Sequence, residues 1–169
     1  AHAIAWHGRD RVLVLSDLHG RFNCLLHALS TIGMPGDSVI GPRGPSMANG
    51  DSKKGHLHIL FNGDIFDNRQ IDDDYVRKAL MTLAMVCMLK QNYPRYVHLV
   101  LGNHELWEDL TIKTFAQGII LLFGDAEGER LVRGIARFCL HFDPYKMIRT
   151  QFGRAIVCAH ASPIPNIKG

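Results

Sequence analysis

The chain has 169 residues, 47% hydrophobic and 21% charged, a composition typical of one globular domain with its own core. Its formal net charge of +3 is too small to indicate a nucleic-acid-binding protein. The sequence contains no run of 18 apolar residues, the length at which a membrane span would be predicted. We therefore expect neither nucleic acid nor a membrane among its partners.

The four cysteines lie in apolar stretches without a CxxC pair, at Cys24, Cys87, Cys139 and Cys158. This usage is typical of buried free thiols in a reducing compartment. No basic-then-apolar signal opens the chain, so we expect a cytoplasmic protein.

The first predicted strand covers residues 11–16 and leads into Asp17, Leu18, His19 and Gly20. Asp17 and His19 are two residues apart, so both side chains can face one point at the end of the strand. Open α/β sheets bind ligands at that end, and a carboxylate with an imidazole suits a divalent transition metal. The alternative is an ordinary turn with an acidic cap.

Residues 1–10 are expected to form a loose lead-in, and apolar residues at 3–4 spacing predict a helix from Gly20 to Gly33. Residues 34–56 are rich in glycine and proline and predict a loop insertion. We favour the interpretation that these residues are an insertion whose entropic cost to stability is small. The alternative is a flap beside a functional site.

The second predicted strand covers residues 57–61, and an amphipathic helix follows it and ends near Pro94. A third strand is expected over residues 96–101, mainly helical structure over residues 106–142, and a fourth strand over residues 154–159. Strands alternating with helices predict an α/β fold with a βαβαβ unit and mostly parallel strands.

Polar side chains follow each of the four predicted strands. They are Asp17 and His19, Asp64 and Asp67, Asn103 and His104, and His160. The carboxyl ends of parallel strands share one edge of a sheet, so we expect these groups to converge. Carboxylates, imidazoles and an amide oxygen are ligands for two divalent cations about 4 Å apart.

These blocks resemble the metallophosphoesterase superfamily and, within it, the phosphoprotein phosphatase branch that contains the serine/threonine phosphatases. GDxHG, GDxxDRG, GNHE and HGG mark that branch in this order. The chain has SDLHG at residues 16–20, GDIFDNR at 63–69, GNHE at 102–105 and HAS at 160–162. The resemblance covers about residues 11–165 and implies a metallophosphoesterase-type β-sandwich flanked by helices, in a single catalytic domain over residues 1–169.

The resemblance also implies a ligand set for two divalent metal ions, each Mn, Fe or Zn. Asp17 and His19 would bind the first metal, and Asn103 and His160 would bind the second. Asp64 would bridge both ions, since one carboxylate can share its charge between two cations.

The implied reaction is hydrolysis of phosphomonoesters by a metal-bound hydroxide. His104 would be the general acid that protonates the leaving oxygen, and Asp67 would hold it protonated. The expected partner is a phosphorylated protein or peptide, with phosphate on a Ser, Thr or Tyr side chain.

The chain departs from the family pattern at the phosphate-binding position. Asn68 stands where the family has an arginine that clamps phosphate through two parallel hydrogen bonds. We assign Asn68 and the adjacent Arg69 to the substrate site, with Arg69 reaching in from one residue later. The change leaves open hydrolysis of a dinucleotide polyphosphate or a nucleotide cap at the same site.

The family has one more metal-binding histidine and another phosphate-binding arginine after the HGG block, whereas this sequence stops at Gly169. We therefore expect the domain to be incomplete at its C-terminus and to belong to a longer phosphatase. A non-catalytic relic that binds partners through residues 34–56 is the alternative of another class. The sequence does not indicate an oligomeric state.

Overall fold

The computed structural model describes residues 4–6, 10–31, 57–66, 73–105, 110–150 and 152–160. The predicted loop insertion at residues 34–56 lies outside these ranges, as do Asp67, Asn68 and Arg69.

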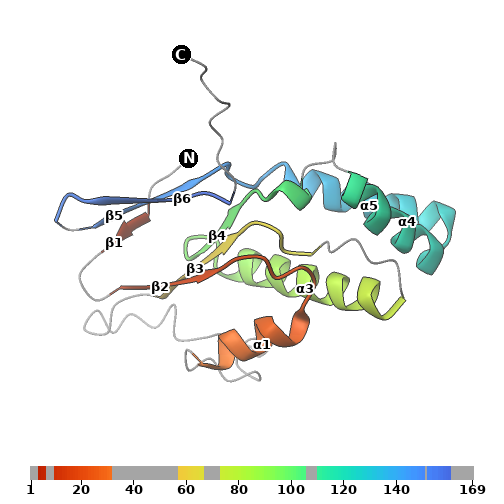
Figure 1. Cartoon of the computed structure of the whole chain (residues 1–169), viewed down its shortest axis with the longest axis horizontal. Coiled ribbons are helices and arrows are strands. Elements are labelled where there is room, and N and C mark those ends of the chain that lie inside the picture. Colours follow the sequence, from red (N-terminus) through yellow and green to blue (C-terminus); the bar gives the residue numbers. More distant parts are fainter. Residues whose placement is uncertain are drawn as a thin grey trace, which may run out of the picture.

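The strands form two three-stranded sheets. One has the order β2 (Arg11–Leu15), β3 (Leu57–Asn62) and β4 (Val97–Val100), and the other β1 (Ile4–Trp6), β5 (Lys146–Thr150) and β6 (Ala155–Cys158). Figure 1 shows the second sheet on one side of the first, with helices α1 (Phe22–Thr31) and α3 (Asp73–Asn92) on the other side. The predicted α/β class with parallel strands flanked by helices is confirmed.

The β2–β3–β4 sheet is parallel throughout, with Val12 opposite His58 and Leu60 opposite His98. Every residue of β4 is buried, as a parallel strand covered on both faces requires. Ile59 belongs to the same core cluster as Leu25 of α1 and other helix residues, so one face of the sheet packs on the helices. The carboxyl ends of all three strands consequently lie at one edge.

Helix α3 shows how local charge and packing hold this arrangement. Asp73 and Asp74 occupy its first turn, where the helix dipole favours negative charge. At its other end Lys90 donates hydrogen bonds from Nζ to the carbonyl of Val97 at 2.7 Å and of Pro94 at 3.0 Å. This lysine therefore fastens the end of α3 to the beginning of β4.

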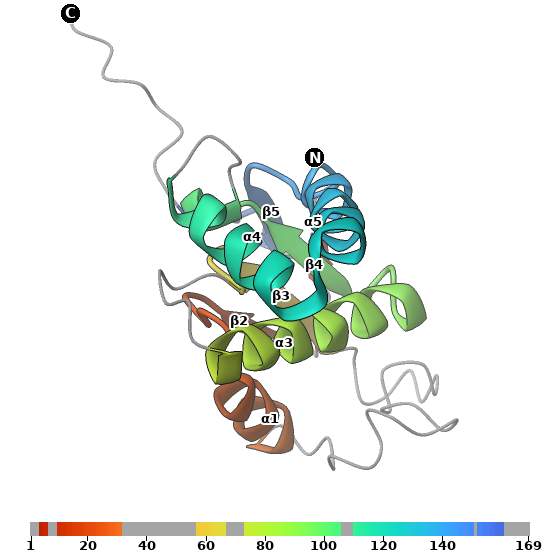
Figure 2. The same cartoon turned by 90° about the vertical axis from the view of Figure 1, so that its right-hand side faces the viewer.

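Helices α4 (Leu110–Phe123) and α5 (Asp125–Cys139) form an antiparallel pair joined at Gly124, whose φ is 81°. Figure 2 shows the pair beside α3. The prediction of mainly helical structure over residues 106–142 is confirmed for the described part of that range. Among the described residues, no helix combines the length and the hydropathy that crossing a bilayer requires.

Two expectations about strands were wrong, and one further strand was missed. Strand β1 lies in the supposed lead-in, strand β5 was not predicted, and β6 pairs antiparallel with β5 in the second sheet instead of joining the parallel one. β1 and β5 are short, and the residues that they pair with each other are more than 140 positions apart in the sequence. Such strands depend on packing and pairing with distant segments more than on local pattern.

All four cysteines are free, as expected, but the expectation that all of them are buried was wrong. Cys139 is buried, Cys87 and Cys158 are half-buried, and Cys24 on α1 is exposed. Burial raises the pKa of the Cys87 thiol to about 11, so this thiol is a poor nucleophile at neutral pH.

Candidate metal centre

The turns after β2 and β3 hold three non-glycine residues in the left-handed region: Asp17 at φ 54°, His19 at φ 45° and Asp64 at φ 50°. The backbone N–H of Asp17 donates to the carbonyl of Gly63 at 3.3 Å, and that of His19 donates to the carbonyl of Asp64 at 2.8 Å. Interstrand pairing thus continues past the strand ends and holds the two turns together. Backbone strain of this kind clusters at functional sites, where the surroundings over-determine it.

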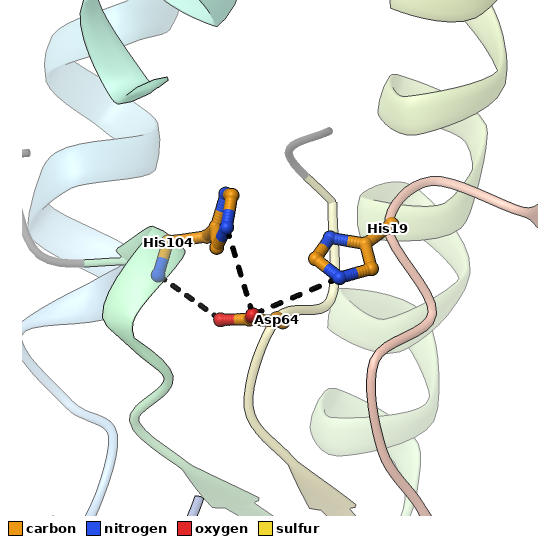
Figure 3. Close-up of side chains that lie close together, drawn as sticks. All are labelled: His19, Asp64 and His104. Atoms are coloured by element: carbon orange, nitrogen blue, oxygen red, sulfur yellow. Dashed lines mark hydrogen bonds and ion pairs between the residues drawn. The ribbon is translucent and has the colours of Figure 1, made fainter. Parts of the chain in front are cut away.

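The carboxylate of Asp64 lies at the centre of the site, and the residue is 3% exposed. Its Oδ2 is 3.7 Å from Nε2 of His19, 3.7 Å from Nε2 of His104 and 3.2 Å from Nε2 of His160. Figure 3 shows the rings of His19 and His104 on either side of this carboxylate. A buried carboxylate requires such partners, because its charge is expensive to remove from water.

Two overlapping groups of side chains have the spacing of a metal-binding site. In one, ligand atoms of His19, Asp64 and His104 all lie within 4.8 Å of one another, and in the other the same holds for Asp17, Asp64 and His160. Asp17 is the exposed member, at 57% side-chain exposure, and its Oδ1 is 3.9 Å from Nε2 of His19. Asp64 belongs to both groups, as a bridging carboxylate would. The groups divide the other side chains differently from the resemblance, which implies Asp17 with His19 at one metal and Asn103 with His160 at the other.

His160 enters the site from the end of β6, in the second sheet. Its Nδ1 lies 2.7 Å from the carbonyl oxygen of Asn62, a geometry in which Nδ1–H donates. Its Nε2 then faces Asn103 Oδ1 at 3.1 Å and Asp64 Oδ2 at 3.2 Å. Three acceptors around one point repel one another unless a positive charge lies between them, either a second proton on the ring or a metal cation. This donor set therefore fits a divalent cation.

His104 follows Asn103 in the short 3-10 helix η1 (Asn103–Glu105) and is buried. Its backbone N–H donates to Oδ1 of Asp64 at 3.0 Å, and its ring packs edge-on against that of His19, with centroids 4.9 Å apart. The predicted partner of its ring, Asp67, lies outside the described residues. The geometry places His104 where it can either donate a proton to a substrate or bind a cation.

The strand ends approach one another so closely that two positions accept only glycine. Gly63 has φ 78°, and a Cβ there would overlap the ring of His160. A Cβ on Gly102 would overlap the backbone nitrogen and Oδ1 of Asp64. The glycines in the GD and GN pairs thus allow β3, β4 and His160 to converge.

Glu105 is a buried residue to which sequence reasoning assigned no role. Its carboxylate accepts backbone N–H groups of Asp64 at 2.9 Å, Ile65 at 2.7 Å and Gly102 at 2.9 Å, and the residue is 1% exposed. Burial raises its pKa to about 7, although these three hydrogen bonds act in the opposite direction. Its only sequence signal was its place as the last residue of GNHE, because two of its partners, Asp64 and Ile65 after β3, lie about 40 residues away in sequence.

The fold and this cluster define an α/β protein with a candidate divalent-metal centre at the carboxyl edge of a parallel sheet. Residues 10–168 match the profile of the calcineurin-like phosphoesterases, and the chain belongs to that family. The resemblance drawn from the four sequence blocks is thereby confirmed.

Two relatives are serine/threonine phosphatases by name. The chain is 25% identical over 158 residues to the serine/threonine-protein phosphatase SIT4 of Candida albicans, covering 93% of this chain and 41% of that protein. It is 27% identical over 117 residues to the serine/threonine-protein phosphatase BSL2 of Arabidopsis thaliana, covering 69% of this chain and 10% of that protein. The chain therefore spans less than half the length of either relative.

A solved structure shares the fold. It is a protein serine/threonine phosphatase from Saccharomyces cerevisiae with similarity to human phosphatase PP5. The TM-score is 0.57 at 19% identity, over 86% of this chain and 38% of that one. The match supports the architecture described above.

Proposed function

We propose that this chain carries the metal centre of a metal-dependent phosphatase that hydrolyses phosphomonoesters. The observation that supports this most is the shared position of Asp64, whose buried carboxylate belongs to both candidate ligand groups. Family membership points to the same chemistry.

In this proposal Asp17 and His19 would hold one divalent cation, Asn103 and His160 would hold a second, and Asp64 would be a ligand common to the two sites. Such cations lower the pKa of water and offset the negative charge of phosphoryl oxygens. Imidazole and carboxylate ligands are compatible with Mn, Fe or Zn.

His104 is the proposed general acid, which holds a proton at a ring nitrogen for transfer to the leaving oxygen. Its backbone N–H is tied to Asp64 and its ring rests against His19, so the imidazole is held in one orientation. Asp67 is proposed to keep that ring protonated. A positioned general acid contributes about 10²–10⁴-fold to a rate.

The proposed substrate is a phosphorylated protein, bound with the help of Arg69 and Asn68. The names of the relatives SIT4 and BSL2 support phosphoserine or phosphothreonine. Asn68, which replaces a family arginine, is the observation that keeps a dinucleotide polyphosphate as the second candidate substrate. We also propose the cytoplasm as the location, which the four free cysteines support.

The test uses the full-length protein that contains this chain. After EDTA treatment we expect no release of phosphate from p-nitrophenyl phosphate, and recovery when Mn²⁺ is added. Asp64→Asn should lower the rate by about 10³-fold, the upper range for losing one group that stabilises transition-state charge. Asp73→Asn, an exposed change at the start of α3, should not alter the rate.

Activity that persists in EDTA would contradict the metal-dependent reaction. A protein that binds metal but hydrolyses no ester would favour the non-catalytic relic. Relative rates on a phosphoserine peptide and on diadenosine tetraphosphate decide between the two substrate classes.

A further inference from the structure

The ends of β3 and β4 are joined by hydrogen bonds that run in both directions. The backbone N–H of Asp64, after β3, donates to Oε2 of Glu105, after β4, at 2.9 Å. In return the backbone N–H of His104, after β4, donates to Oδ1 of Asp64 at 3.0 Å. Each turn therefore supplies a carboxylate that binds the backbone of the other.

Glu105 is the larger contributor to this connection. Its second oxygen accepts the N–H of Ile65 at 2.7 Å, and Oε2 also accepts the N–H of Gly102 at 2.9 Å. Three backbone donors from two separate turns meet on one carboxylate that is almost inaccessible to water. Hydrogen bonds are electrostatically stronger in such an environment, where water is excluded.

The backbone conformation of Asp64 explains why such a tie is needed. An aspartate at φ 50° is strained, and it remains so only where its surroundings hold it. Glu105 accepts the N–H of Asp64 and the N–H of Ile65. It therefore restrains the two peptide units on either side of the Asp64 Cα. That backbone in turn determines where the Asp64 carboxylate lies among His19, His104 and His160.

We propose that Glu105 is a positioning residue of the metal centre, which holds the Asp64 carboxylate between the two ligand groups and so sets the affinity for divalent metal. The inference rests on the proposed function for the metal itself. The hydrogen bonds by which Glu105 joins the two turns can be tested in the metal-free protein by hydrogen exchange.

The decisive variant is Glu105→Gln in the full-length protein. A glutamine side chain has the same shape, but its NH₂ group would face a backbone N–H and lose at least one of the three hydrogen bonds. The matched control is Leu89→Ala, which removes a buried apolar side chain of α3 and so destabilises the fold without touching Glu105 or the site.

Two readouts are taken on both variants and on the parent protein. Hydrogen exchange of the metal-free protein should quicken at Asp64, Ile65 and Gly102 more than along β3 in Glu105→Gln, but not in Leu89→Ala. Calorimetric titration with Mn²⁺ should show affinity reduced by about 10–100-fold in Glu105→Gln, the usual range for losing a group that orients a metal ligand. Leu89→Ala should bind Mn²⁺ like the parent.

An affinity of Glu105→Gln equal to that of the parent, or reduced no more than in Leu89→Ala, overturns the proposal. If the parent protein binds no Mn²⁺, the proposed function fails. The exchange rates at the three amides still show in that case whether Glu105 holds the two turns together.

Discussion

The two ends of the β2–β3–β4 sheet both carry buried histidines, yet the residues around them differ in charge. At the carboxyl end, the rings of His19, His104 and His160 face the carboxylate of Asp64. At the amino end, Nδ1 of His58 lies 3.1 Å from Nε2 of His98, and the two rings stack with centroids 5.4 Å apart. The first arrangement offers ligands around an acid, and the second pairs two imidazole rings.

Burial and the charges near His98 explain why the pKa of this histidine is lowered. Burial, followed by the positive charge of Lys146, the neighbouring His58 and Lys90, lowers the pKa of His98 to about 3, and Asp143 only partly offsets this. Asp143 is also bound by Lys146, with Nζ to Oδ2 at 2.8 Å. A cation is therefore unfavourable at this end, whereas Asp64 favours one at the other end.

The backbone differs in the same way. His58 and His98 lie in regular strands, whereas Asp17, His19 and Asp64 adopt left-handed conformations just beyond the strand ends. Histidine content alone therefore does not identify a metal site. The charge of the neighbours and the strain of the backbone distinguish the candidate metal centre from the structural pair.

The largest expected effect separates the histidines of the two ends by activity. His104→Ala in the full-length protein should lower kcat by about 10²–10⁴-fold, because it removes the proposed general acid. His98→Gln should leave kcat within a few-fold of the parent, because His98 lies at the amino end of the strands. Steady-state rates on a phosphopeptide, measured well below the melting temperature of each variant, test this. Equal losses in both variants would remove the distinction between the ends.

A second effect concerns the close packing of the carboxyl end. Gly63→Ala should lower the free energy of unfolding by about 2–5 kcal/mol, as the sum of about 1–2 for a left-handed residue and about 1–3 for overpacking against His160. Gly134→Ala in α5, where a Cβ meets nothing within 4 Å, should instead raise it by about 0.5–1 kcal/mol. Urea denaturation measures both. A neutral result for Gly63→Ala would contradict the packing described here.

A third effect is the pH dependence that the amino end imposes on stability. Folded His98 has a pKa of about 3, below that of the unfolded chain, so the unfolded state binds more protons between about pH 3 and 6.5. The free energy of unfolding should consequently fall as the pH falls through this range, by up to about 1.4 kcal/mol per pH unit. His98→Phe should reduce that slope.

The slope is best measured between pH 5 and 6.5 as the difference between variant and parent, because the raised pKa of Glu105 acts in the opposite direction in both proteins. His27→Gln, an exposed change on α1, is the control and should keep the parent slope. An unchanged slope in His98→Phe would show that the pair at the amino end does not restrict protonation.

The smallest effect tests the strain at the carboxyl end. Asp17→Gly should raise the stability of the metal-free protein by up to about 1 kcal/mol, because glycine adopts a φ of 54° without a steric penalty. The same change should weaken Mn²⁺ binding, because it removes a proposed ligand. Urea denaturation in EDTA and calorimetric titration measure the two effects. A loss of stability in EDTA would show that Asp17 contributes contacts that outweigh its strain.

Local pattern was sufficient for much of this molecule. Apolar runs at residues 57–61 and 96–101 predicted strands β3 and β4, and 3–4 spacing predicted the helices that cover them. The polar residues after these strands could be placed at one edge because parallel strands share their direction. The roles of Asp67, Asn68 and Arg69 remain predictions, since those residues lie outside the described ranges.

Contacts between residues that are distant in sequence could not be predicted from local sequence patterns. Nothing near Glu105 in sequence shows that its carboxylate binds Asp64 and Ile65, about 40 residues earlier. Strands β1 and β5 are short, and the residues that they pair with each other are more than 140 positions apart in the sequence.

The sequence by itself determined the family, the βαβαβ unit and which residues stand at the strand ends, because these depend on periodicity and on motifs a few residues long. Only the tertiary structure decided that β6 lies in a second sheet and that His160 still reaches Asp64 from there. It also decided which histidines face an acid and which face lysines. The physical reason is that the pKa and the ligand capacity of a side chain depend on the charges around it in space, and those charges come from distant parts of the chain.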